Sequence, residues 1–221
     1  AKQIAKNPEF NKAYIKINEL LAKNIEHPKL LELKSIVEKS IKENPKAKII
    51  VFSQYRDTGV RICKTLNEIQ GINARVFVGQ AKKTNDKGVV SGLNQKEQHE
   101  ILNEFREGKI NIIASTSIGE EGLDIMEVSE VIFYEPIPSA IRNIQRRGRT
   151  ARLMKGKLTI LITKDTLDEI FYYAAIAKEK RMYKAIESIK EDMDNGKSIQ
   201  DLNHEDEKKT EENKSEQKKL F

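Results

Sequence analysis

The sequence contains one cysteine, three histidines and no tryptophan among its 221 residues. A single cysteine, Cys63, excludes an intramolecular disulfide framework. His27, His99 and His204 have no cysteine or carboxylate partners at ligand spacing, so no metal site is expected. No apolar run approaches the ~20 residues that a membrane span needs, and no apolar core of a signal peptide is seen. These absences predict a cytoplasmic protein with no membrane partner.

Two further absences concern ATP. The sequence contains no G-x-x-x-x-G-K-[ST] motif, the glycine-rich loop that cradles phosphates. It also contains no Asp-Glu-x-His or Asp-Glu-Ala-Asp run that would supply carboxylates for Mg²⁺. We therefore expect that this chain by itself does not hydrolyse ATP.

The charge is unevenly distributed. Residues 1–190 carry 34 basic and 24 acidic side chains, a net charge of +10, whereas residues 191–221 carry ten acids and six bases, a net charge of −4. A basic body indicates a polyanionic partner, although lysine-rich surfaces also serve solubility alone. The tail has too few apolar residues to offset its ordering entropy, so we expect 191–221 to be a disordered linker.

Short apolar strands alternate with amphipathic helices through the middle of the chain. Strands are predicted at 48–53, 73–78, 110–115, 131–135 and 158–163. Helices are predicted at 29–42, 58–69, 95–107, 139–147 and 165–189, and a mobile loop at 79–94. This alternation predicts a doubly wound α/β domain with a parallel sheet, whose ligand sites lie at the carboxyl ends of the strands. An apolar stripe from Phe10 to Ile25 predicts one further helix over 1–26, which we expect to be the end of a preceding helical domain or a helix that faces a partner.

Three segments follow predicted strands or helices and carry polar chemistry. The strongest is Gln145-Arg-Arg-Gly-Arg-Thr-Ala-Arg152, because five arginines lie within eleven residues and no acid occurs between Glu135 and Asp165. Arginine presents a planar fork that suits phosphate oxygens. The alternative is a solvated basic helix end or a surface for an acidic protein.

The other two segments directly follow buried strands. Ala114-Ser-Thr-Ser-Ile-Gly-Glu-Glu-Gly-Leu-Asp-Ile125 supplies hydroxyls, glycines and a carboxylate that suit phosphate or sugar contacts, but small residues are also common in ordinary turns. Ile49-Ile-Val-Phe-Ser-Gln-Tyr-Arg56 runs from a strand into polar residues, and a loop without a ligand is its alternative explanation.

In this order and at these distances, the three segments resemble motifs IV, V and VI of the superfamily 2 helicases. The resemblance covers the second RecA-like domain, and we assign it to 28–190, between a helical segment at 1–27 and the tail. The residues of these motifs are most similar to those of archaeal fork-processing helicase–nucleases of the Hef type and of the Fanconi-anaemia M type. The nuclease signature of that family, Glu-Arg-Lys-x-x-x-Asp, does not occur here.

The resemblance implies a role for each matching residue. Arg149 and Arg152 match the arginine fingers that contact the γ-phosphate of ATP held by the first RecA-like domain. Residues that match nucleotide-contacting positions are Gln145, Arg146, Asp124 and Gly122. Residues that match nucleic-acid-contacting positions are Ser53, Gln54, Arg56, Gly79, Gln80, Thr116, Ser117 and Gly119. ATP and Mg²⁺ would be bound mainly by the first RecA-like domain, which this sequence does not contain.

The resemblance implies an ATP-dependent helicase or translocase of forked or branched DNA, in DNA repair and at the nucleoid. RNA helicases and RNA-sensing ATPases of the same superfamily share much of the pattern, so RNA remains an alternative. A non-catalytic nucleic-acid-binding module is a second alternative. The composition fits an archaeal source, and Gln217-Lys-Lys-Leu220-Phe221 resembles the start of a sliding-clamp-binding box, although the terminal aromatic pair is absent.

Overall fold

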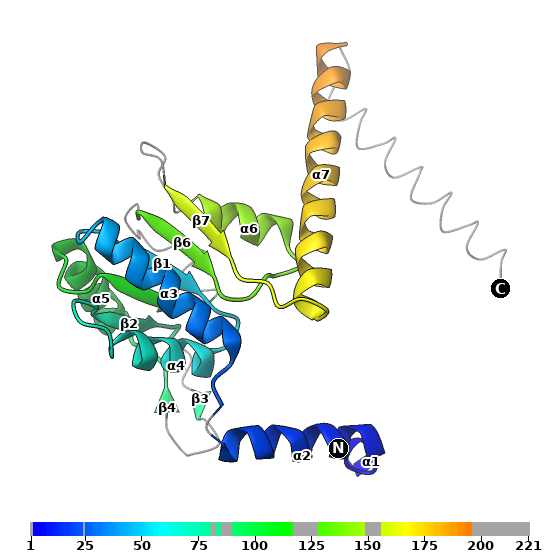
Figure 1. Cartoon of the computed structure of the whole chain (residues 1–221). Coiled ribbons are helices and arrows are strands. Elements are labelled where there is room, and N and C mark those ends of the chain that lie inside the picture. The colour runs from blue at the N-terminus through cyan, green and yellow to red at the C-terminus, as the bar shows by residue number, and fades with distance from the viewer. Residues whose placement is uncertain are drawn as a thin grey trace.

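The computed structural model describes residues 2–23, 25–80, 83–84, 90–116, 128–148 and 156–195, and of residues 2, 3, 83, 84, 90 and 91 it describes the backbone alone. These residues form a five-stranded parallel sheet in the order β2-β5-β1-β6-β7, with helices on both faces (Figure 1). The strands are β1 Ile49–Phe52, β2 Ala74–Phe77, β5 Ile112–Ser115, β6 Glu130–Phe133 and β7 Lys157–Ile160. The predicted α/β fold is confirmed.

The helices that precede, alternate with and follow these strands match the predicted ones within a few residues. They are α3 Pro28–Glu43, α4 Arg56–Leu66, α5 Gln95–Glu107, α6 Ala140–Arg147 and α7 Leu167–Asp194. Helix α5 begins with the predicted capping box, in which Asn94 and Glu97 satisfy each other's backbone N–H groups. Among the residues that the structure describes, no helix is long and apolar enough to cross a lipid bilayer.

Strand β1 lies in the middle of the sheet. Its last residue, Phe52, pairs with Ser115 of β5 on one side and with Phe133 of β6 on the other. Ser115 in turn pairs with Phe77 of β2. Because all these strands are parallel, the segments that follow them emerge along one carboxyl edge, where ligand sites of doubly wound sheets lie.

Alternate residues of the strands build two apolar cores. On one face, Ile49 and Val51 of β1 pack with Leu33 of α3 and Ile62 of α4. On the other face, Ile50 and Phe52 pack with Leu102 and Phe105 of α5. Strands β1, β5 and β6 are buried along their whole length, which is why their sequences are apolar at every position except at the ends.

The N-terminal region differs from the prediction of one helix over 1–26. It forms two helices, α1 Lys2–Ala5 and α2 Pro8–Ala22. The break arises because Asn7 is an N-cap whose side chain accepts from the backbone N–H groups of Glu9 and Phe10, and Pro8 starts the new helix. Helix α2 has no buried residue and stands apart from the sheet (Figure 1). The assignment of 1–27 to a preceding domain stays a prediction.

Two other boundaries differ. The segment 79–94, predicted as a loop, contains a short antiparallel hairpin of β3 Lys83–Thr84 and β4 Val90–Ser91. Helix α7 continues to Asp194, so the expected tail does not begin at residue 191. Once its first turns are formed, a helix extends at little cost, so the polar residues at the end of α7 remain helical. Residues 196–221, with the candidate clamp-binding box, lie outside the described residues.

Candidate functional site

Three of the predicted nucleic-acid-binding segments lie along the carboxyl edge of the sheet. Ser53, Gln54 and Arg56 follow β1, Gly79 and Gln80 follow β2, and Thr116 follows β5. Because the order β2-β5-β1 makes these strands neighbours, the structure places the three segments in a row. Ser117 and Gly119 lie outside the described residues. The contacts of these residues with nucleic acid stay predictions.

The turn after β1 is stabilised by a buried side chain. Ser53 is fully buried and its hydroxyl donates to the carbonyl of Tyr55 at 3.1 Å. Gln54 and Tyr55 are exposed above it. Helix α4 starts close behind this turn, because a Cβ added to Gly59 would lie 3.4 Å from the Ser53 hydroxyl. Ser53 therefore supports the turn from below, whereas Gln54 and Tyr55 form its outer surface.

The turn after β2 is tied to its neighbours. The Arg56 guanidinium donates to the Gly79 carbonyl at 3.5 Å, which joins the turns after β1 and β2. Gln98 of α5, which is buried, donates its side-chain amide to the Val78 carbonyl at 2.9 Å. The predictions did not include Gln98. The one sequence signal for it is its position in the first turn of a helix whose capping box is visible in the sequence.

Thr116, after β5, is nearly buried, and its carbonyl accepts from the Ser115 hydroxyl at 3.1 Å. The predicted residues that follow it, Ser117 and Gly119, lie outside the described residues. Among the predicted nucleic-acid-binding residues, the exposed ones that the structure describes therefore lie in the loops after β1 and β2.

Helix α6 carries two of the residues predicted to contact nucleotide. Arg146 is 2% exposed, and its guanidinium carbon lies 4.7 Å from the ring centroid of Phe52 and 5.4 Å from that of Phe133. Such a position over aromatic faces is a cation–π interaction. The side-chain oxygen of Gln145 is buried and finds no hydrogen-bond donor among the described residues. Arg149, Arg152, Asp124 and Gly122 lie outside the described residues.

Helices α6 and α7 are fastened together. Arg147 of α6 forms an ion pair with Glu179 of α7. Lys178 of α7 donates to the carbonyl of Pro138, just before α6, at 2.8 Å. The helix that carries Gln145 and Arg146 is therefore linked to the long C-terminal helix at both of its ends.

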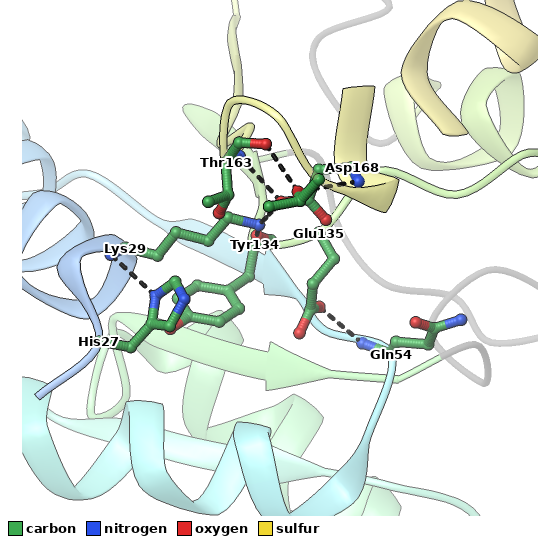
Figure 2. A network of polar contacts seen from close by, with 8 residues as sticks. His27, Lys29, Gln54, Tyr134, Glu135, Thr163 and Asp168 are labelled. Atoms are coloured by element: carbon green, nitrogen blue, oxygen red, sulfur yellow. Dashed lines mark hydrogen bonds and ion pairs between the residues drawn. The ribbon is translucent and has the colours of Figure 1, made fainter. Parts of the chain in front are cut away.

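Figure 2 shows a polar network at the same carboxyl edge, between α3, the segments after β1, β6 and β7, and the start of α7. Lys29 forms a nearly buried ion pair with Asp168 and donates to the Tyr134 carbonyl at 3.0 Å. Asp168 also accepts from the Thr163 backbone N–H at 2.9 Å. Glu135 accepts from the Gln54 backbone N–H at 2.9 Å. This network therefore holds together α3, the segments after β1 and β6, and the connection from β7 to α7.

The network shifts the titration of its acids. Burial alone would raise the pKa of Asp168, but hydrogen bonds from Lys29 and Thr163 and the charge of Lys29 outweigh it, so this pKa is lowered. Burial raises the pKa of Glu135 above its usual value, although the Gln54 N–H and the charges of Lys29 and Arg146 oppose the rise. Burial and nearby carboxylates raise the pKa of Tyr134 to about 12.

A cavity of about 660 Å³ opens beside the network. Its lining includes apolar Leu30 and Ile62, the network residues Lys29 and Asp168, and the ion pair of Glu26 with Arg61. No local sequence pattern predicts this cavity, because its walls come from segments more than a hundred residues apart. Across the described ranges, no three His, Cys, Asp or Glu side chains gather in a way that could hold a metal ion.

Comparison with known proteins identifies the family. Residues 29–154 match the model of the helicase conserved C-terminal domain. A putative ATP-dependent RNA helicase of Methanocaldococcus jannaschii is 41% identical over 86% of this chain and 23% of its own length. A putative ATP-dependent DNA helicase of Schizosaccharomyces pombe is 35% identical over 78% of this chain and 22% of its own length. This chain thus spans less than a quarter of either relative.

Solved structures agree with the sequence comparison. The crystal structure of the Pyrococcus furiosus Hef helicase domain matches with a TM-score of 0.59 and 43% identity, over 79% of this chain and 34% of that one. The C-terminal domain of the DEAD-box protein Dbp5 matches with a TM-score of 0.53 at 20% identity, which supports the RecA-like fold alone. The chain belongs to the helicase conserved C-terminal domain family and has its RecA-like fold.

Proposed function

We propose that this chain is the second RecA-like domain of an ATP-dependent DNA helicase or translocase that acts on forked or branched DNA. The observation that carries the proposal is the row of segments after β2, β5 and β1 at one edge of the sheet. On that edge, exposed Gln54 and half-buried Arg56 offer an amide and a guanidinium to a phosphate backbone. Contacts of this kind bind without regard to sequence and weaken as salt rises.

The nucleotide side of the proposal rests on α6 and the residues after it. The side-chain oxygen of Gln145 is a buried acceptor with no donor among the described residues, and a hydroxyl or amino group of a nucleotide would suit it. Arg149 and Arg152 would stabilise charge on the transferring phosphoryl group of ATP, whose hydrolysis supplies the free energy for movement. The phosphates and Mg²⁺ would be held mainly by a first RecA-like domain in the same polypeptide.

Movement would come from closing and opening the cleft between the two domains. Each closure changes the distance between two surfaces that grip the backbone, so alternate grip and release moves the strand. In this chain, Arg146 of α6 packs against Phe52, which links the helix proposed to contact nucleotide with the strand that leads into the nucleic-acid turn. The ion pair of Arg147 with Glu179 also links α6 to α7. Phe52 directly precedes Ser53 and Gln54.

An RNA helicase is the second candidate, because one relative at 41% identity carries the name of a putative RNA helicase. DNA is favoured because other relatives are named DNA helicases and because the Hef helicase domain is 43% identical. Steady-state ATPase assays of the full-length protein with forked DNA, linear duplex DNA and duplex RNA separate the candidates. Strongest stimulation by forked DNA supports the proposal, and strongest stimulation by duplex RNA supports the alternative.

A further inference from the structure

The pairing between β1 and β6 ends in an unusual way at the carboxyl edge. The last regular bond runs from the Tyr134 N–H to the Phe52 carbonyl at 2.9 Å. In this register, the next step of a parallel ladder would pair the Gln54 N–H with the Tyr134 carbonyl and the Gln54 carbonyl with the N–H of residue 136. Residue 136 is Pro136, which has no N–H, so the ladder cannot continue.

Side chains replace the missing step. The Tyr134 carbonyl accepts from the Lys29 ammonium at 3.0 Å, and the Gln54 N–H donates to the Glu135 carboxylate at 2.9 Å (Figure 2). The carboxylate thus takes the place of a strand carbonyl. As a result, the chain after β1 is held against β6 without being extended as a strand.

The Glu135 carboxylate accepts its hydrogen bond from Gln54, which is one of the exposed residues of the turn after β1. Below it, Ser53 is buried and bonded to the Tyr55 carbonyl, and beyond it Arg56 bonds to Gly79. Gln54 has no neighbour in this set that fixes its backbone N–H except Glu135. The conformation of the outward-facing residues therefore depends on a carboxylate from another strand.

We propose that Glu135 is a positioning residue for nucleic-acid binding, because its carboxylate anchors the backbone of Gln54 and fixes the turn that presents Gln54 and Arg56 to the phosphate backbone. The inference rests on the proposed function, since it assumes that this turn contacts nucleic acid. It adds a residue that lies outside the three segments from which the function was argued.

The chemistry separates this role from a simple effect of charge. A carboxylate near a phosphate-binding surface repels phosphate, so removing its charge alone should not weaken binding. What the turn requires is an acceptor at the right distance. Glu135→Gln keeps a side-chain oxygen at that distance without the charge, whereas Glu135→Asp keeps the charge but withdraws the oxygens by one methylene.

The test measures binding of fluorescein-labelled forked DNA to the 221-residue chain by fluorescence anisotropy. We expect Glu135→Ala and Glu135→Asp to raise Kd about five- to tenfold, and Glu135→Gln to stay within about twofold of the parent. Glu32→Ala removes an exposed carboxylate of α3 and serves as the matched control, with unchanged Kd. Hydrogen exchange at the Gln54 amide should speed up in Glu135→Ala and Glu135→Asp only.

The outcomes separate the two proposals. If the parent chain binds forked DNA but all three variants bind equally well, the positioning role is wrong and the proposed function stands. Weaker binding by Glu135→Gln than by Glu135→Asp would also overturn it, because charge and not acceptor geometry would then matter. If the parent chain binds no nucleic acid, the proposed function of the turn fails, and the role of Glu135 fails with it. If Glu135→Ala does not fold, the Kd values of Glu135→Gln and Glu135→Asp still test the positioning role.

Discussion

The guanidinium carbon of Arg146 lies 4.7 Å from the centroid of the Phe52 ring, inside the core and not on the surface. Arg146 belongs to the arginine-rich segment for which the family resemblance predicts nucleotide contacts, and Phe52 ends the strand that leads into the predicted nucleic-acid turn. One side chain thus joins helix α6 to the central strand.

Replacing Arg146 by alanine should lower the free energy of unfolding by about 3 kcal/mol, because a large buried side chain leaves a cavity and two aromatic contacts are lost. Urea denaturation followed by circular dichroism measures this change. Arg142→Ala, on the exposed side of the same helix, should change the free energy by less than about 0.5 kcal/mol. Equal effects of the two substitutions would show that Arg146 is not part of the core.

The ion pair of Lys29 with Asp168 should make the free energy of unfolding depend on pH in the acidic range. The pKa of Asp168 is lowered in the folded state, so its contribution is present above the ordinary aspartate pKa and is lost as the pH falls through the lowered value. Asp168→Asn should lower the free energy of unfolding by about 2 kcal/mol at neutral pH, and the difference should shrink as the pH falls below the ordinary aspartate pKa and through the lowered one.

The control for that prediction is Glu43→Gln, which removes a carboxylate from the exposed pair with Lys39. Exposed pairs contribute little, so this change should cost less than about 0.5 kcal/mol at any pH. Urea denaturation at a series of pH values measures both variants. A deficit of Asp168→Asn that stayed constant with pH would contradict the assigned role of its charge.

Gln98 should matter for nucleic-acid binding although it lies below the surface. Gln98→Ala leaves the Val78 carbonyl without its donor and loosens the segment with Gly79 and Gln80. We expect about a three- to fivefold rise in Kd for forked DNA and a loss of about 1–2 kcal/mol in stability. His99→Ala, exposed on the same helix, should change neither quantity. A loss of stability with unchanged Kd would exclude a role in that segment.

The 221-residue chain alone should release no phosphate from ATP above background, even with saturating forked DNA. The physical reason is that its sequence contains no P-loop motif to hold the phosphates. A coupled phosphate-release assay measures this. Turnover that depends on both this chain and DNA would show that ATP is bound in a way that the family resemblance does not explain.

The sheet and its helices were predictable because local signals and the global fold agree. Apolar runs such as 49–52 are strands buried on both faces, and the Asn94 to Glu97 spacing sets the start of α5. The capping signal at Asn7 and Pro8 was also in the sequence, but the continuous apolar stripe concealed it. Periodicity locates a helix better than it locates a helix end.

The candidate site was predictable only as a set of segments. Their alignment follows from strand order, but the residues that hold them do not. Glu135 bonds to a residue 81 positions away, and Lys29 bonds to one 105 positions away, so neither contact leaves a local pattern. The burial of Arg146 leaves no local pattern either, because it depends on the Phe52 and Phe133 rings of two strands. Its contact with nucleotide stays a prediction.

The most direct test of the account is the ATPase rate of the full-length protein with Arg149 replaced by alanine, measured with forked DNA beside Arg142→Ala. If the chain supplies an arginine finger, Arg149→Ala should lower kcat by about 10³-fold, with Kd for DNA within about twofold of the parent and Arg142→Ala near the parent in both. A kcat for Arg149→Ala within about twofold of the parent would contradict the account, because the arginine-rich segment would then have no catalytic role.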